Sequence, residues 1–295
     1  MQNRDYLLKL IDDGQNVRVW LAHTTNLVEE ARQRHQTSAT ATAALGRALT
    51  AAVMMGSDLK SDHDLLSLRF NGNGPAGTII ATADGHGHVK GLIGNPQADL
   101  PSRFPGKLAV GDLVGKEGYL EVIKDMGLKQ PFEGRVPLVS GEIAEDLAQY
   151  FMQSEQIPAL VSLGVLVDTD LHVLAAGGLI VQALPEADDT VLERLENNIL
   201  SLDQISQLIF VNNSLEDITS TIMQGIEYSI LDVMDLAFRC NCSRERLGII
   251  LAGLSEQELR EAAENNKDIE AICNFCKTVY TFSPEEIKAL QSEKP

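Results

Sequence analysis

The first 239 residues of this 295-residue chain contain no cysteine, and the whole chain has one tryptophan. This lack of cysteine excludes a disulfide framework spread through a secreted fold. Charged residues interrupt the amino terminus, so it has no apolar signal-peptide region, and nowhere do about 18 apolar residues run together. We therefore expect a cytoplasmic protein that does not associate with membranes.

Common catalytic motifs are also missing. The sequence contains no G-x-S-x-G, no H-E-x-x-H and no Walker glycine loop with its lysine. The glycine-rich stretch from Gly72 to Gly77 leads into an expected strand instead of a helix, so it lacks the free amides that hold a phosphate. We expect that the protein is not an enzyme.

Basic residues are few, and they are unevenly distributed. The formal net charge is −18 and the pI is near 4.7, which opposes binding to a phosphate backbone, so we expect no nucleic-acid partner. Residues 181–230 hold nine acidic residues and one base, Arg194, and therefore carry −8 of this charge. Such a segment repels itself, so its fold must be conditional or well supported.

The sequence predicts an acidic helical linker over residues 181–231. Thr190 and Glu193 form a capping box ahead of a run of Leu and Ile at helical spacing, and Ser214 opens a second such run that continues to Ile230. Two interpretations stay open. The segment is either an ordinary helical hairpin on a core or a metastable linker whose docking depends on the domain that follows.

Residues 1–180 are predicted to form an α+β core domain, with an antiparallel sheet and packed helices. Apolar and polar residues alternate from Val17 to Leu21, an alanine-rich helix is expected from Ser38 to Met55, and the turns at Asn71–Pro75 and Asp84–Gly85 are typical of β-hairpins. Further strands are expected at 118–123, 135–139, 159–167 and 172–183, with a helix at 143–153.

All four cysteines lie in the expected third domain, residues 232–295. Cys240 and Cys242 form C-x-C, and after a 30-residue spacer Cys273 and Cys276 form C-x-x-C. Two thiolate pairs at short spacing can direct four soft ligands at one tetrahedral ion, which suits Zn²⁺ first and an iron–sulfur centre second. We therefore predict a small four-cysteine zinc domain at the carboxy terminus.

The predicted zinc could be a permanent staple or part of a switch. Each motif holds two thiols close enough in the chain to be oxidised to one another. Arg239, Arg244 and Arg246 around the first pair would favour thiolates, unless they only form a solvated helix face. A segment of about 60 residues buries little surface, so its folding should depend on the metal. These features favour a switch.

Several motifs are shared with one known family. They are FRCNCSRER at 238–246, CNFC at 273–276 followed by Tyr280 and Phe282, RDYLLKL near the amino terminus, LGRALTAAVMM and RFNGNGP. Along essentially its whole length the chain resembles the heat shock protein 33 family of redox-regulated holdase chaperones.

This resemblance implies a reduced form that is inactive as a chaperone and binds zinc through Cys240, Cys242, Cys273 and Cys276. It also implies that oxidation joins Cys240 to Cys242 and Cys273 to Cys276, expels zinc, unfolds the linker and exposes a surface for unfolding client proteins, often in a homodimer. Two alternatives stay open, namely a constitutive zinc-ribbon interaction module and a thiol oxidoreductase that uses the C-x-x-C motif.

Overall fold

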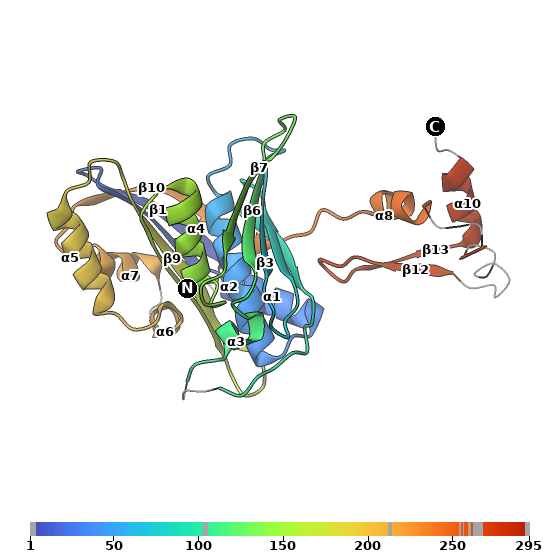
Figure 1. Ribbon diagram of the computed structural model, residues 1–295, viewed down its shortest axis with the longest axis horizontal. Coiled ribbons are helices and arrows are strands. Elements are labelled where there is room, and N and C mark those ends of the chain that lie inside the picture. Colours follow the sequence, from blue (N-terminus) through green and yellow to red (C-terminus); the bar gives the residue numbers. More distant parts are fainter. Residues whose placement is uncertain are drawn as a thin grey trace. The chain divides into compact units, whose positions relative to one another are not determined.

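Two β-sheets with a helix between them form the amino-terminal unit of the chain, residues 1–238 (Figure 1). The computed structural model describes residues 4–102, 106–211, 214–253, 255, 257–258, 261 and 268–292. The second unit spans residues 239–295. Both units mix helices and strands, which confirms the predicted α+β class.

The first sheet has five antiparallel strands in the order β10 (Tyr228–Asp235), β1 (Tyr6–Asp12), β2 (Val17–His23), β9 (Val173–Ala183) and β8 (Ala159–Val167). The second sheet follows the order β11 (Ala237–Phe238), β5 (His88–Ile93), β4 (Ile79–Ala83), β3 (Leu65–Asn71), β6 (Tyr119–Asp125) and β7 (Phe132–Pro137). Only the β11–β5 pair in this sheet is parallel among the described strands.

Helix α2 (Ala39–Gly56) contacts strands of both sheets and is buried on all sides. Its many alanines allow this close packing, and at Gly46 an added Cβ would lie 2.6 Å from Val28 and 2.9 Å from Val165. Ser38 caps the helix by accepting a hydrogen bond from the Ala41 amide. The helix predicted from Ser38 to Met55 is therefore confirmed, and no helix in the described ranges is long and apolar enough to cross a bilayer.

The remaining helices of this core are α1 (Thr25–His35), α3 (Val110–Val114) and α4 (Ala144–Tyr150), which continues into the π-helical turn η1 (Phe151–Glu155). The predicted strands and the two hairpins are confirmed within a few residues. Strand β1 and helix α1 were not predicted.

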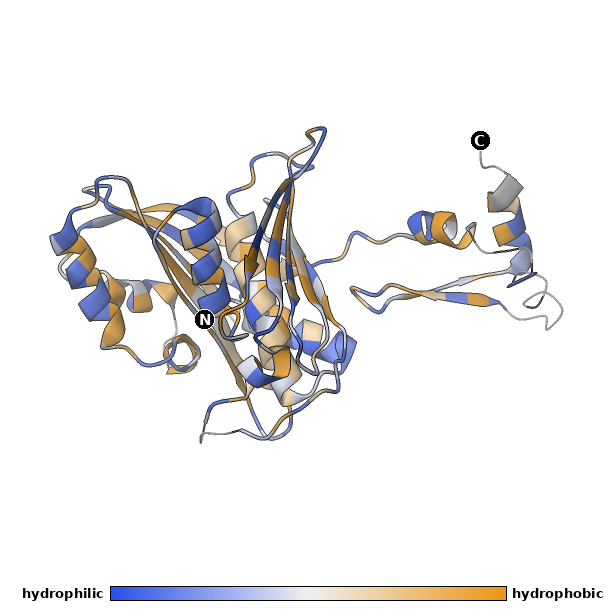
Figure 2. Cartoon of the chain, in the orientation of Figure 1, coloured by the Kyte–Doolittle hydropathy of each residue, from blue (hydrophilic) through white to orange (hydrophobic). Residues whose placement is uncertain are grey.

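Three short helices in the acidic segment cover the face of the five-stranded sheet opposite α2 (Figure 1). They are α5 (Asp189–Leu200), α6 (Ile205–Val211) and α7 (Leu215–Ile222). Hydrophilic and apolar residues are interspersed along α5, as Figure 2 shows, whereas α6 has no charged residue. We call these helices the linker helices.

The linker helices bury an apolar surface of the sheet, which we call the covered face. The sheet contributes Tyr6, Leu8, Leu10, Val17, Val19, Leu21, Ala175, Leu179 and Val181, all buried. The helices contribute Leu195, Ile205, Ile209, Leu215, Ile218 and Ile222, also buried. The acidic segment is thus held mainly by apolar packing against the sheet.

One polar contact ties α7 to the edge of this face. The Tyr6 hydroxyl donates a hydrogen bond to Glu216 at 2.8 Å and accepts one from the Leu215 amide at 2.8 Å. Burial, followed by the effect of Glu216, raises the pKa of Tyr6 to about 12, and the phenol therefore stays protonated and able to donate.

The helical run predicted to continue from Ser214 to Ile230 is wrong beyond Ile222. Helix α7 ends there, Gly225 takes the left-handed conformation at φ 74°, and residues 228–235 form β10. Pairing with β1 satisfies the backbone hydrogen bonds of this stretch and outweighs the helical spacing of its isoleucines. The cap of α5 is Asp188, two residues before the predicted one, whereas Ser214 caps α7 as expected.

The carboxy-terminal unit is small. It contains α8 (Arg244–Leu251), the hairpin of β12 (Ile269–Ile272) and β13 (Val279–Phe282), and α10 (Pro284–Ser292). Its fully buried apolar cluster consists of Ala271, Phe282 and Ile287 in the described part of the unit. The predicted boundaries at residues 180 and 231 stay a prediction, and the linker helices belong to the amino-terminal unit.

Candidate metal centre

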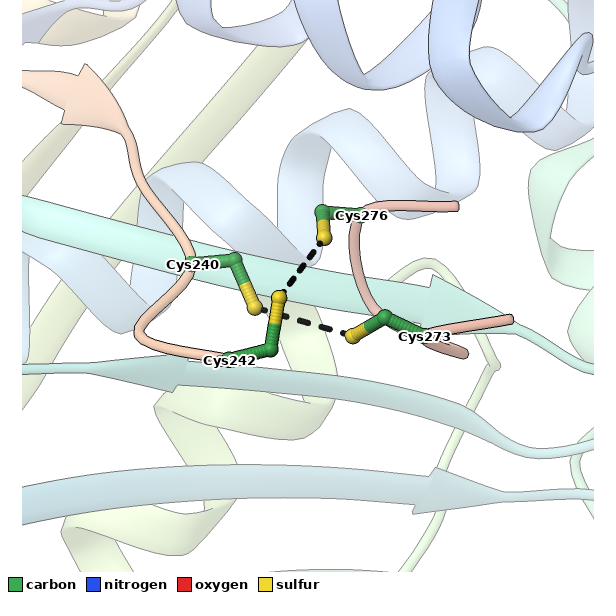
Figure 3. A group of neighbouring side chains, drawn as sticks. All are labelled: Cys240, Cys242, Cys273 and Cys276. Atoms are coloured by element: carbon green, nitrogen blue, oxygen red, sulfur yellow. Dashed lines mark hydrogen bonds between the residues drawn. The ribbon is translucent and has the colours of Figure 1, made fainter. Parts of the chain in front are cut away.

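The structure brings all four predicted cysteines together in the carboxy-terminal unit (Figure 3). Their sulfur atoms all lie within 4.8 Å of one another. Cys240 Sγ is 3.8 Å from Cys273 Sγ, and Cys242 Sγ is 3.3 Å from Cys276 Sγ. Each of these contacts joins one thiol of the C-x-C motif to one thiol of the C-x-x-C motif.

Local structure positions each pair. Cys240 and Cys242 lie in the extended segment between β11 and α8, and Ser243 then starts α8 by accepting a hydrogen bond from the Arg246 amide. Cys273 and Cys276 lie in the turn of the β12–β13 hairpin. The C-x-C sulfurs therefore come from the segment that leads into α8, and the C-x-x-C sulfurs come from the hairpin turn.

Hydrogen bonds and one left-handed residue close the hairpin turn. The Cys273 amide donates to the Thr278 carbonyl at 3.0 Å, and the Lys277 amide donates to the Cys273 carbonyl at 2.8 Å. Lys277 has a φ of 59°, which reverses the chain immediately after Cys276. This turn brings the two thiols of the motif to one side of the hairpin.

The donor set fits a tetrahedral metal ion. Four sulfurs about 2.3 Å from a central zinc would lie about 3.8 Å from one another, which agrees with the 3.3 and 3.8 Å contacts. Cys273 and Cys276 are buried, and Cys240 and Cys242 are half-buried. Among the described residues this is the one group of three or more His, Cys, Asp or Glu side chains arranged to hold a metal.

Two of the four thiols, Cys240 and Cys242, resist ionisation. Burial, with a contribution from neighbouring thiols, raises the pKa of Cys240 to about 12 and also raises that of Cys242. Burial alone would raise the pKa of Cys276 as well, but hydrogen bonds from the Thr278 hydroxyl and amide outweigh it and lower that pKa to about 7. A divalent cation would supply the positive charge that four adjacent thiolates require.

Two hydroxyl groups lie beside the sulfurs, one in β13 and one on the residue just before this strand. Tyr280 Oη is 3.4 Å from Cys242 Sγ, and Thr278 Oγ1 is 3.2 Å from Cys276 Sγ. Sequence reasoning missed Thr278 and gave Tyr280 no role. The available signal was the alternation of Thr278 and Tyr280 in the extended segment after the turn, because alternate residues of such a segment share a face.

The arginines near the first cysteine pair have other partners. Arg244 donates to the Thr281 carbonyl and to Glu286, and its guanidinium lies 4.3 Å from the centre of the Phe282 ring. Arg246 donates to the Asn241 carbonyl. These contacts fit the solvated helix face for Arg244 and Arg246, and those of Arg244 fasten α8 to β13 and α10.

Comparisons with known proteins agree on one family. The family model described as Hsp33 protein matches residues 5–283. The "33 kDa chaperonin" of Desulforamulus reducens is 48% identical over 287 residues, covering 97% of each chain, and that of Clostridioides difficile is 45% identical over 290 residues, covering 98% of this chain and 99% of the relative. A crystal structure of the 33 kDa chaperonin (heat shock protein 33 homolog) from Thermotoga maritima matches with a TM-score of 0.91 at 36% identity, over 98% of both chains.

Proposed function

The chain belongs to the Hsp33 family of chaperones, and from this premise we propose that it is a redox-regulated holdase. In the reduced form Cys240, Cys242, Cys273 and Cys276 bind zinc and the protein is inactive. Oxidation converts the four thiols into two disulfides, releases the zinc and unfolds the linker. The protein then binds unfolding clients and prevents their aggregation.

The observation that carries this proposal is the covered face. Nine buried residues of the five-stranded sheet lie beneath helices whose segment has a net charge of −8. If those helices detach, the sheet and the helices both offer apolar surface, which is what an unfolding client binds. The remaining negative charge keeps such an exposed surface soluble.

Zinc is the metal that the donor set favours. Four thiolates in a closed tetrahedral arrangement are typical of structural zinc sites, and an iron–sulfur centre is the second choice. When bound, zinc would stabilise the ionised form of all four thiols. The chain's own residues supply the sulfurs, and the hydroxyls of Tyr280 and Thr278 lie within hydrogen-bond distance of the Cys242 and Cys276 sulfurs.

The folding of the carboxy-terminal unit should depend on that metal. Its buried cluster of three apolar residues is small, and structural zinc contributes about 10–16 kcal/mol of apparent binding free energy in comparable peptides. Loss of the metal therefore removes more free energy than such a cluster can replace. We propose that the unit unfolds when its thiols are oxidised and that this loosens the linker helices.

The oxidation step needs a two-electron oxidant such as a peroxide. One thiolate attacks a peroxide oxygen, which breaks the O–O bond, forms a sulfenic acid and releases hydroxide. A second thiolate attacks that sulfur, forms the disulfide and expels another hydroxide. One peroxide is consumed for each disulfide, so two peroxides oxidise the four thiols.

We propose that the disulfides join Cys240 to Cys242 and Cys273 to Cys276. The short sequence spacing and the family resemblance support this pairing. Sulfur contacts of 3.8 and 3.3 Å instead join Cys240 to Cys273 and Cys242 to Cys276, so the proposed pairing requires the thiols to rearrange as the metal leaves. Disulfide mapping by mass spectrometry after peroxide treatment tests the pairing, and the crossed pairs would contradict it.

We further propose that the cycle runs in the cytoplasm and that the active form is a homodimer. A reducing compartment is needed to return the disulfides to the zinc-binding thiols. Light scattering coupled to size-exclusion chromatography tests the assembly. A rise in mass to that of two chains is expected after oxidation, and an unchanged mass would contradict the dimer.

The test of function is aggregation of a chemically unfolded client diluted into buffer. The protein is added either zinc-reduced or pre-oxidised by peroxide under mild heat, and client aggregation is followed by light scattering. Suppression by the oxidised sample alone is expected. If both samples fail although zinc is lost on oxidation, the cysteines are a structural staple and the constitutive zinc-ribbon module becomes the better account.

A further inference from the structure

A cavity of about 250 Å³ lies in the amino-terminal unit, between the two sheets and away from the cysteines. Apolar side chains from both sheets, the carboxyl end of α2 and η1 form much of its wall. They include Met54, Met55, Leu59, Leu66, Phe151 and Ile180. Two of these residues are methionines, whose flexible side chains adapt to the shape of a ligand.

Two hydrogen-bond donors in the wall are buried without a partner. Trp20 is 5% exposed, and neither its indole Nε1 nor Arg18 Nε has a hydrogen-bond partner among the described residues. Both nitrogens can donate but cannot accept. Buried polar groups in folded proteins nearly always have partners. Both nitrogens have almost no accessible surface, so an acceptor from outside the chain reaches them only when neighbouring side chains of the wall shift.

The two carboxylates of the wall, Asp58 and Glu155, are both paired with cations other than Arg18. Lys124 pairs with Glu155 at 2.5 Å, and Asp58 pairs with a lysine of β1 at 3.0 Å. Arg18 donates to the Gln182 side-chain oxygen at 3.1 Å. Within the described ranges no carboxylate pairs with Arg18, although the chain as a whole carries −18. Arg18 is thus the uncompensated cation of the cavity.

The Arg18 guanidinium is also held in place. Its central carbon lies 4.9 Å from the centre of the Trp20 ring, and the Gln182 contact fixes its other side. A guanidinium with a fixed orientation loses little conformational entropy when it binds an anion and presents donors suited to a carboxylate.

We propose that this cavity binds a small carboxylate with a short apolar chain. The carboxylate accepts hydrogen bonds from Arg18 and Trp20. The apolar chain of the ligand lies against the apolar wall at the carboxyl end of α2. A cavity of about 250 Å³ has room for a ligand of the size of hexanoate. This site is separate from the cysteine centre and from the covered face.

Trp20 makes the proposal directly measurable, because it is the only tryptophan of the chain. The reduced full-length protein is titrated with hexanoate while the tryptophan fluorescence is followed, and stoichiometry is measured by calorimetry. We expect a saturable fluorescence change at one hexanoate per chain. Hexanol, which lacks the charge, and acetate, which lacks the chain, should each bind at least about tenfold more weakly, equal to about 1.4 kcal/mol.

Variants identify the binding residues. Arg18→Gln should weaken hexanoate binding at least about tenfold. Arg69→Gln on β3, outside the cavity wall, removes an arginine of the same unit and should leave binding unchanged. Leu59→Phe narrows the cavity without touching Arg18, so it keeps the test valid if Arg18→Gln does not fold, and it should also weaken binding. Absence of saturable hexanoate binding, or equal binding by wild type and the two cavity variants, would overturn the proposal.

Discussion

Attachment of helix α7 to the sheet can be weakened from within the covered face. Ile218 is 3% exposed and packs in the apolar cluster beneath the linker helices. Ile218→Ala removes three carbon atoms, worth about 2.4 kcal/mol at about 0.8 kcal/mol each, and leaves a cavity that adds to the loss. We therefore expect about 3 kcal/mol of destabilisation, within the range of about 2–5 kcal/mol found for such changes.

A change of this size raises the population of the detached linker about a hundredfold, since about 1.4 kcal/mol corresponds to a factor of ten. Hydrogen exchange on the reduced, zinc-bound protein measures this directly. The amides of residues 189–222 should exchange about a hundredfold faster, while those of β3 and β6 keep their protection. Leu200→Ala, at a 73% exposed position of α5, is the matched control and should change protection little.

Comparing hydrogen exchange in the linker helices with that in β3 and β6 shows whether the linker detaches separately from the rest of the unit. If Ile218→Ala lowers protection in β3 and β6 as much as in the linker helices, the linker opens only when the whole amino-terminal unit unfolds. The proposed separate detachment of the linker would then be refuted. If the reasoning holds, the variant should also suppress client aggregation at a lower degree of oxidation than the wild type.

Three further outcomes are expected. Tyr280→Phe removes the hydroxyl beside the Cys242 sulfur and should weaken zinc binding about tenfold or more in a chelator competition, whereas Tyr228→Phe should not. Chelation of zinc with the thiols kept reduced should abolish exchange protection in residues 239–292 while the amino-terminal unit stays folded, and retained protection would refute the coupling of metal and folding. Burial would raise the pKa of Glu29, but hydrogen bonds, chiefly from Arg32, lower it from 4.5 to about 2, so it adds stability above pH 4.5 that is lost as pH falls toward 2. Glu29→Gln should flatten this pH dependence in urea unfolding measured across that range.

Local signals made much of the fold predictable. The spacing of the cysteines identified the four thiols that the structure gathers, because a tetrahedral site needs two close pairs. The small residues from Ser38 to Met55 identified α2, and the Asn-Gly and Asp-Gly turns identified the hairpins of the second sheet. In each case the information lies within a few residues of the element it describes.

Pairing across long sequence separations was not predictable. Strand β1 pairs with β10, more than 200 positions away. Because of this pairing, a segment whose isoleucine spacing is typical of a helix forms the strand β10. The sulfur contacts between the two cysteine motifs and the Tyr280 hydroxyl at Cys242 also depend on chain segments that meet only in three dimensions. Hydrophobic periodicity indicates which face of a helix or strand is buried, but it does not indicate which segment of the chain packs against that face.

The length of the linker helices makes their detachment and their unfolding one event. They have 12, 7 and 8 residues, and isolated helices shorter than about 12–15 residues are marginal in water. Removed from the covered face, they lose the apolar packing that holds them, while the repulsion among their acidic side chains remains. The freed segment is then an acidic, flexible chain that still carries Leu and Ile side chains. A small loss of docking free energy would therefore expose the sheet and the segment together, as the proposed response to thiol oxidation requires.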